Sequence, residues 1–351
     1  MSASTLSSVA IVRRPEPTLW SRIGRARWCY FFAAPALLLA CLFTFYPTVM
    51  SWYYSLLDWN GFTADSQFVG LANYRRLIRD PLFWSAFGRS FLFVAVAVPI
   101  RMVLALIVAI ILNNQSFKIA PVYRTMFFLP VVTSAAVVGV VMSSVMSPFH
   151  GPINTMLSQL HVVSGPIDFL GNPHTALWSV IAVQIWKDFG ITMIYWLAAL
   201  QTVPRSTYEA AETDGAGRFA VFTQITIPLL LPFGAIILLL TANNTLHVFA
   251  IVQAMTAGGP YFSSQVIETY IYQTAFAPTD PGVAPQLGYA SAAGCFFGLA
   301  TMIIAVLQVW VGRAIGIRRS TTPSTPDSDP TPPSSIQATS PQATSTRTEG
   351  A

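Results

Sequence analysis

Residues 201–228 read QTVPRSTYEAAETDGAGRFAVFTQITIP, a comparatively polar stretch that separates two long apolar runs. Pro204 ends the run before it, because proline cannot continue a helix without losing a backbone hydrogen bond. Ser206 is a good helix N-cap, and Glu209 follows three residues later, where it can complete a capping box. The stretch therefore predicts a short helix that begins near Ser206.

A bend and a second short segment follow this helix. Gly215 and Gly217 give the backbone the freedom to turn. Residues 218–227 then place three apolar side chains about one helical turn apart, which predicts a second amphipathic helix, too short to cross a membrane. Two interpretations are open for such an element: it lies on the membrane surface, or it contacts another protein.

Outward from this stretch, the chain consists mainly of apolar runs of about 20 residues, the length that crosses the hydrocarbon core of a bilayer. Six runs qualify: residues 30–50, 90–112, 126–146, 175–200, 229–251 and 291–311. Alternating apolar and polar positions, the pattern of half-buried strands, do not occur. The predicted fold class is all-α, a multi-pass transmembrane bundle of six helices.

The composition agrees with a membrane environment. Of the 351 residues, 54% are apolar and only 9% are charged, whereas soluble domains carry about 25% charged residues. A water-facing surface cannot be built from so few charges, which excludes an ordinary soluble enzyme or a nucleic-acid-binding domain. The three cysteines, Cys29, Cys41 and Cys295, lie in or beside apolar runs and are interpreted as small apolar fillers, without a disulfide framework or a zinc site.

The distribution of lysine and arginine predicts the orientation. The N-terminal tail, the second-to-third connection, the fourth-to-fifth connection and the C-terminal tail hold 13 of the 19 basic residues. With six spans these four regions share one side, and the positive-inside rule makes that side the cytoplasm. The first opposite loop dilutes the bias with four arginines: Arg75, Arg76, Arg79 and Arg89.

Three segments follow from these observations. Residues 1–29 are expected to be a cytoplasmic tail, and residues 30–315 the transmembrane domain. Residues 316–351 are dominated by Ser, Thr, Pro and Ala and cannot bury much apolar surface, so we expect a disordered cytoplasmic tail.

The stretch 201–228 resembles the EAA signature of binding-protein-dependent ABC importer permeases. That signature consists of E-A-A, three residues, G, nine residues and I-x-L-P. The matching residues are Glu209, Ala210, Ala211, Gly215, Ile225 and Pro228, and Asp214 before the glycine is also typical of the family. Ile227 stands where the family usually has leucine, a conservative difference.

Weaker matches place the resemblance in the carbohydrate-uptake branch, which is similar to the maltose and glycerol-3-phosphate permeases. Residues 68–74 resemble an F-x-G-L-x-N-Y stretch, and residues 256–260 resemble T-x-G-G-P after the fifth span. The matches at residues 124–130 and 288–292 fall at the starts of the third and last spans. The resemblance to the carbohydrate-uptake branch rests on the order and spacing of these stretches together.

The resemblance implies a type I ABC importer permease fold, in which residues 201–228 form the loop that couples the permease to an ATPase. It also implies a second homologous permease, two ATP-binding subunits and an extracytoplasmic solute-binding protein as partners, in a bacterial inner membrane. The chain lacks G-x-x-x-x-G-K-[ST], the phosphate-binding loop of an ATPase. ATP and Mg²⁺ are therefore expected on a partner, and we expect no catalytic residue, cofactor or metal ligand here.

Five polar residues inside the predicted spans are candidates for the translocation path, because lipid-facing charge is costly. They are Arg101, Lys187, Asn243, Asn244 and His247. The alternative for Arg101 is an ion pair within the bundle, and for the residues of the fifth span it is hydrogen bonding between helices. Lys187 and Asp188 are adjacent, so their side chains are expected to leave the helix in different directions, each with its own partner.

The substrate implied by the resemblance is a carbohydrate, with glycerol 3-phosphate or another polyol phosphate as the alternative. An ion-coupled secondary transporter and a membrane scaffold without transport are the rival classes. The signature loop and the scarcity of intramembrane carboxylates argue against the first, and the intramembrane charges argue against the second.

Overall fold

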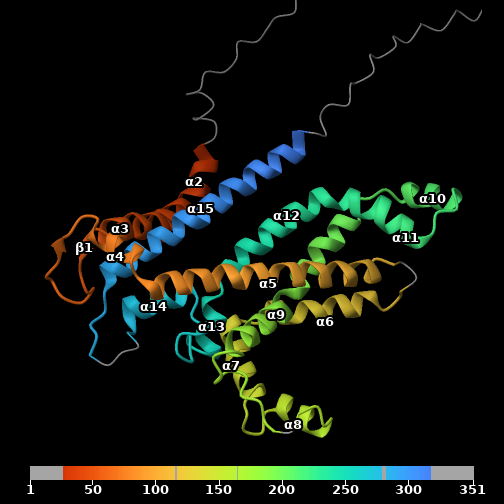
Figure 1. The fold of residues 1–351 in the computed structure, drawn as a ribbon. Helices are drawn as coiled ribbons and strands as arrows, with labels where there is room; N and C mark the ends of the chain where they lie inside the picture. Colours follow the sequence, from red (N-terminus) through yellow and green to blue (C-terminus); the bar gives the residue numbers. More distant parts are fainter. Residues whose placement is uncertain (1–26, 115–116, 164, 279–281, 318–351) are drawn as a thin grey trace, which may run out of the picture.

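The computed structural model describes residues 27–114, 117–163, 165–278 and 282–317 of the chain. Nearly all of the regular structure in these ranges is helical (Figure 1). One two-residue hairpin, β1 (Leu57–Asp58) paired antiparallel with β2 (Gln67–Phe68), lies in the loop after the first span. The predictions for residues 1–26 and 318–351 lie outside the described residues.

Five helices are long and apolar enough to cross a membrane, and a bent pair makes a sixth span if it is counted as one. In chain order the spans are Cys29–Tyr54, α5 (Pro81–Leu112), the pair α6 (Ala120–Val132) and α7 (Ala135–Val145), α9 (Ala176–Leu200), Arg218–Leu246, and α15 (Leu287–Ile317). This arrangement confirms the all-α membrane bundle.

Shorter helices connect the spans at both ends of the bundle. They are α4 (Ala72–Ile78), α8 (Pro152–Gln159), α10 (Arg205–Thr213), α13 (Phe249–Met255) and α14 (Ile267–Phe276). In Figure 1, α10 lies at one end of the bundle, and α4 and α14 lie at the other.

Two long helices contain a π-helical turn directly before a proline. In the first span, α2 (Arg27–Ala40) and α3 (Tyr46–Tyr54) are joined by η1 (Cys41–Phe45), and Pro47 follows. Similarly, η2 (Phe222–Thr226) precedes Pro228. A wider turn makes room for the proline ring and accommodates its missing N–H, so the helix continues.

This continuity corrects one prediction. Residues 218–227 are not a separate amphipathic helix, because α11 (Arg218–Val221) and η2 run without a break into α12 (Ile227–Leu246). The predicted fifth span, 229–251, therefore begins earlier than expected. It also ends earlier, since α12 stops at Leu246 and the chain restarts as α13.

The predicted third span, 126–146, is also interrupted. α6 and α7 meet at an angle of 98°, and the two residues between them, Thr133 and Ser134, have extended backbone angles. Pro130 lies close to the end of α6 and cannot donate a backbone hydrogen bond there. An uncharged apolar run alone did not reveal this bend.

The bundle core lies between α5 and α9, which pack along most of their lengths. One cluster of buried apolar residues joins α5 and α9 to α7 and α13, and a second joins them to α12. Gly190 of α9 allows α6 to approach, because a Cβ at this position would lie 2.1 Å from the carbonyl oxygen of Phe127. A third cluster joins α4, α5, α14 and α15.

Candidate functional site

The residues of the signature separate into two elements. Glu209, Ala210 and Ala211 lie on α10 and Gly215 directly after it, whereas Ile225 and Pro228 belong to the long helix that follows. The predicted capping box is wrong. The N-cap of α10 is Pro204, two residues before the predicted Ser206, and the Glu209 carboxylate lies 3.0 Å from Nε of Arg205 instead.

The end of α10 is closed by a Schellman motif. The backbone N–H of Ala216 donates to the carbonyl of Ala211 at 2.9 Å, and that of Gly215 to Glu212 at 3.1 Å. Gly215 has φ +74°, a conformation that an L side chain adopts only with strain. Gly217 has φ −68° and needs no such freedom. The signature glycine is therefore set by the turn after α10.

α10 presents its signature residues outward. Glu209, Ala210, Asp214 and Gly215 are exposed, whereas Ala211 is buried. Two residues that follow the turn, Arg218 and Phe219, are also exposed, and the Phe219 ring is 79% exposed. An exposed apolar ring, together with exposed small side chains and an unobstructed glycine, is suited to contact with another protein surface.

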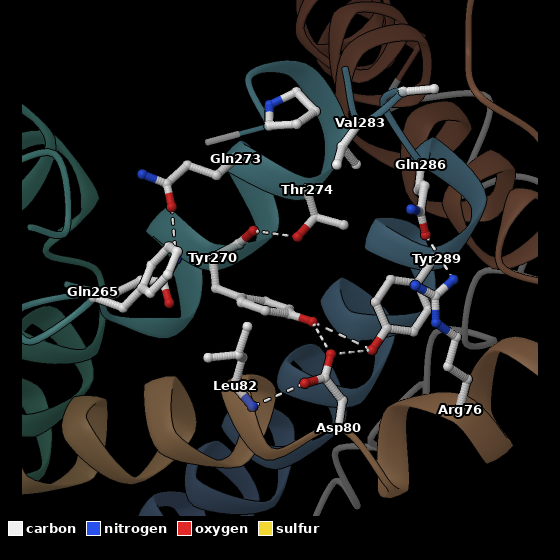
Figure 2. A pocket seen from close by; sticks show the side chains of 13 residues that line it. Arg76, Asp80, Leu82, Gln265, Tyr270, Gln273, Thr274, Val283, Gln286 and Tyr289 are labelled. Carbon is white, nitrogen blue, oxygen red and sulfur yellow. Dashed lines mark hydrogen bonds between the residues drawn. The ribbon is translucent and has the colours of Figure 1, made fainter. Parts of the chain in front are cut away.

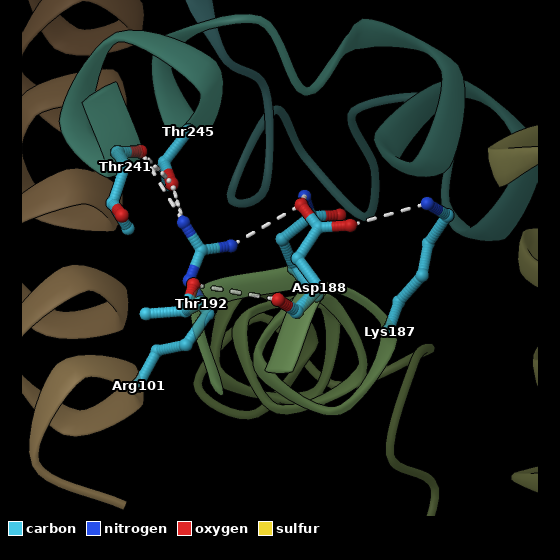
Figure 3. Close-up of polar contacts among 7 residues, drawn as sticks. Arg101, Lys187, Asp188, Thr192, Thr241 and Thr245 are labelled. Carbon is cyan, nitrogen blue, oxygen red and sulfur yellow. Dashed lines mark hydrogen bonds and ion pairs between the residues drawn. The ribbon is translucent and has the colours of Figure 1, made fainter. Parts of the chain in front are cut away.

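A second site lies inside the bundle and contains Arg101 of α5 (Figure 3). Its side chain is almost completely buried and donates to Asp188 Oδ2 of α9 at 3.2 Å. It also donates to the carbonyl of Thr241 at 3.2 Å and to Oγ1 of Thr245 at 2.9 Å, both on α12. Arg101 thus connects three helices, and its Nε has no hydrogen-bond partner among the described residues.

Lys187 and Asp188 do not have separate partners, contrary to the prediction. Nζ of Lys187 lies 3.1 Å from Oδ1 of Asp188, and the amide of Gln184 donates to Oδ2 of the same carboxylate at 2.7 Å. One carboxylate therefore serves two cations. A flexible lysine stem can reach its sequence neighbour even though the two Cα–Cβ bonds diverge.

The polar residues of the fifth span lie where α12 ends. Asn243 is half-buried, and Asn244 and His247 are exposed. Nδ1 of His247 lies 2.8 Å from Oε1 of Glu268, and Oε2 of Glu268 accepts the backbone N–H of Phe249 at 2.9 Å. Glu268, which the sequence analysis did not single out, thus stabilises the start of α13 from the neighbouring α14. Whether Asn243, Asn244 and His247 line the path stays a prediction.

The sequence analysis also missed a cluster at the opposite end from α10, centred on Asp80 (Figure 2). Asp80 is the N-cap of α5, and its Oδ1 accepts the backbone N–H groups of Leu82 at 2.8 Å and Phe83 at 3.3 Å. Its Oδ2 accepts the hydroxyls of Tyr270 at 2.6 Å and Tyr289 at 2.7 Å. Both tyrosines are far away in sequence, so no local pattern reveals the cluster.

These contacts fix the protonation of the cluster. Burial by itself would raise the pKa of Asp80, but the hydrogen bonds from Tyr270, Tyr289 and the two backbone N–H groups outweigh it and hold this pKa below its ordinary value. Burial, together with the hydrogen bond to Asp80, raises the pKa of Tyr270 far above its ordinary value. Asp80 is therefore an anion, and Tyr270 a neutral donor, at neutral pH.

Asn73, from the stretch 68–74 that resembles F-x-G-L-x-N-Y, has a structural role at this end of the bundle. The amide of Asn73, which is buried on α4, donates to the carbonyls of Ser55 and Leu57 at 2.9 Å each. It therefore ties α4 to the chain after the first span. Among the described residues no group of His, Cys, Asp or Glu could hold a metal ion.

Comparison with known proteins identifies the family. Residues 81–317 match the family described as the binding-protein-dependent transport system inner membrane component. The chain belongs to this family.

The permease has curated relatives of similar length. It is 34% identical over 286 residues to the lactose transport system permease protein LacF of Rhizobium radiobacter, covering 81% of this chain and 93% of that one. It is 30% identical over 325 residues to the diacetylchitobiose uptake system permease protein NgcF of Streptomyces coelicolor, covering 87% and 90%. Both matches include α10 and the spans around it.

A solved structure has the same fold. It is a bacterial alginate ABC transporter in complex with a periplasmic protein that holds an alginate pentasaccharide. One of its chains matches the permease with a TM-score of 0.72 and 24% sequence identity, covering 85% of this chain and 98% of that one. The chain is thus an inner-membrane permease component, a transporter subunit and not an enzyme.

Proposed function

We propose that this permease is one of two homologous membrane subunits of an ATP-driven importer, together with two ATP-binding subunits and an extracytoplasmic solute-binding protein. The exposed α10 carries the proposal. Its small residues Ala210 and Gly215 are exposed, as is Phe219, which follows the turn, and α10 lies at one end of the bundle. That surface would dock into a groove of the ATP-binding subunit, which would hold ATP and Mg²⁺.

The continuity of the helix after α10 gives a route for coupling. A push on α10 would be passed through its closed turn to α11, and from there along a single helix as far as Leu246. Asn244 and His247 lie at the far end of this helix. Rigid-body motion of one helical element is a common way of opening and closing a path, and here it would provide alternating access.

The cargo we propose is a neutral carbohydrate. Two observations support this proposal. The relatives are named for the sugars that they transport, and both cations inside the bundle are paired with a carboxylate. Arg101 and Lys187 both contact Asp188, which offsets one of their two positive charges and weakens their attraction for a phosphate. The proposed orientation places α10 and both termini in the cytoplasm, as the basic residues predict.

Uptake by cells that express the complete set of subunits tests this proposal. We expect uptake of one of labelled glucose, maltose and lactose, and its loss in cells without the ATP-binding subunit. Gly215→Asp should abolish uptake while the subunit still assembles in the membrane. Uptake that survives without the ATP-binding subunit would favour an ion-coupled transporter, and uptake of glycerol 3-phosphate alone would overturn the carbohydrate assignment.

The path residues need a test of their own. Replacing Asn244 and His247 together by alanine should remove one hydrogen bond to the cargo at each position. We therefore expect uptake to fall about tenfold, while the subunit still assembles in the membrane. Leu240→Ala is the control, because Leu240 is exposed on the same helix and apolar. Equal uptake by the double variant and the control would remove these residues from the path.

A further inference from the structure

The end of the bundle opposite α10 contains a pocket of about 190 Å³ (Figure 2). It lies among the start of α5, α14, the start of α15 and the side chain of Arg76 from α4. Most of its wall is polar or aromatic: Arg76, Phe262, Gln265, Thr274, Gln286 and Tyr289. The path residues and the coupling element are elsewhere, so this pocket has no role in the function proposed above.

The pocket has a buried acceptor without a partner. Gln265 is 3% exposed, and its Nε2 donates to Oε1 of Gln273 at 2.6 Å. Its own Oε1 has no hydrogen-bond partner among the described residues. Leaving a buried carbonyl unpaired is unfavourable, so a hydroxyl donor that reaches this oxygen after a small shift of the surrounding side chains would be bound favourably.

The opposite wall supplies donors. Nη1 of Arg76 donates to Oε1 of Gln286 at 2.7 Å, and the guanidinium carbon lies 4.4 Å from the centre of the Tyr289 ring. These two contacts hold the guanidinium in place at the wall. A guanidinium has five N–H donors, so Arg76 retains donors beyond the one that it gives to Gln286.

Charge in the wall favours a neutral ligand. Asp80 lies beside Arg76 in the lining and is ionised, so the two charges offset each other. Both Asp80 oxygens are already engaged by Tyr270, Tyr289 and the start of α5. What remains for a ligand is a mixture of donors and an acceptor beside an aromatic ring, which suits hydroxyl groups better than a phosphate or a carboxylate.

We propose that this pocket is an outer-face subsite for one ring of a neutral saccharide, occupied before the sugar passes into the bundle. Its volume is smaller than the roughly 300–1,000 Å³ of typical small-molecule sites, which limits the occupant to a single ring. The proposal rests on the carbohydrate function and the orientation proposed above, and it adds a site on the extracytoplasmic side of the permease that would receive the sugar.

Thiol protection tests occupancy directly. In a background with Cys29, Cys41 and Cys295 replaced, Leu82→Cys places a thiol in the pocket lining, and Ile78→Cys places one nearby but outside it; both positions are exposed. Right-side-out vesicles with the complete importer and no binding protein are treated with a membrane-impermeant maleimide. The probe is whichever of glucose, maltose and lactose the wild type takes up.

We expect the sugar to slow labelling of Leu82→Cys by about tenfold at ten times its Kd, and to leave Ile78→Cys unchanged. Glycerol 3-phosphate should protect neither thiol. Equal labelling rates of Leu82→Cys with and without the sugar would overturn the subsite, and equal protection of both thiols would indicate a change of the whole outer face instead.

A pair of arginine variants tests the contribution to transport. Arg76→Gln should raise the KM of uptake about tenfold, as expected for a lost charged hydrogen bond, with Vmax changed less than about twofold. Arg79→Gln, three residues further along the chain and outside the lining of this pocket, should leave both KM and Vmax unchanged. If the wild type imports a sugar and the two variants behave alike, the subsite is wrong while the importer assignment stands. If the wild type imports no sugar, the proposed function itself fails.

Discussion

Helix α10 and the bundle interior both contain an arginine beside a carboxylate, in opposite surroundings. Arg205 and Glu209 lie 3.0 Å apart within one helix, with side chains 75% and 62% exposed. Arg101 and Asp188 lie 3.2 Å apart on different helices, with side chains 2% and 17% exposed. The exposed pair is screened by water and worth little, whereas loss of one buried partner leaves an uncompensated charge.

The difference in exposure between the two ion pairs indicates a different role for α10 and for the bundle interior. The exposed pair leaves α10 free to meet another protein, because few contacts tie this helix to the rest of the chain. The buried network holds α5, α9 and α12 in register and leaves no exposed surface for a partner. Four substitutions test this contrast, in order of decreasing expected effect on the free energy of unfolding.

Asp188→Asn should have the largest effect. It leaves Arg101 and Lys187 without a counter-charge in the bundle, and removing one partner of a buried pair costs about 3–5 kcal/mol. The measurement is the free energy of unfolding of the purified permease in detergent. Asp58→Asn is the control, because Asp58 is exposed. Equal stabilities of the two variants would show that the interior network contributes no more than a surface charge.

Asp80→Asn should cost about 1–3 kcal/mol at neutral pH, because its charged hydrogen bonds to two tyrosines and a helix start are weakened. The pKa of Asp80 is lowered by folding, so its contribution is fully present above the unfolded pKa and is lost as pH falls through the folded pKa. The difference between wild type and variant, followed by thermal unfolding from neutral pH downward, should therefore shrink in acid. A constant difference would contradict the assigned ionisation.

Gly215→Ala should cost about 1–2 kcal/mol locally, since alanine is strained at φ +74°. Gly217→Ala should cost less than about 0.5 kcal/mol, because its φ is −68° and both positions have open space for a Cβ. Hydrogen exchange of α10 reports the local cost, and uptake reports the coupling. If both alanine variants transported equally poorly, packing against the ATP-binding subunit, and not backbone conformation, would explain the signature glycine.

Arg205→Gln should have the smallest effect. An exposed pair at positions i and i+4 of a helix contributes about 0.3–0.5 kcal/mol, and high salt should remove even this difference from the wild type. Hydrogen exchange of α10 at low and high salt measures it. A loss above about 1 kcal/mol would mean that the two regions are less different than their exposure indicates.

The sequence predicted much of α10 and the turn after it, because the signals for them are local. The E-A-A triplet and Gly215 lie within seven residues, and a Schellman turn depends on few others. The capping box failed for a local reason too, since the N-cap is Pro204, two residues before Ser206, and Glu209 pairs with Arg205. Composition and run length were likewise enough for the membrane bundle.

The breaks in the spans were not predictable in the same way. The turn at Thr133 and Ser134 and the end of α12 at Leu246 lie within apolar runs that a length criterion counts as continuous. The π-helical turns had the opposite effect, since they carried two helices past prolines that would be expected to end or kink them.

The sequence by itself determined that this chain is a helical membrane protein with a short polar helix between two spans, because hydropathy and turn signals act over neighbouring residues. Only the tertiary structure decided which polar groups meet. Arg101 reaches Asp188 and Thr245 across 87 and 144 positions of the chain, and Asp80 reaches Tyr270 and Tyr289 across 190 and 209. Such contacts depend on how helices pack in three dimensions, and no local pattern encodes them.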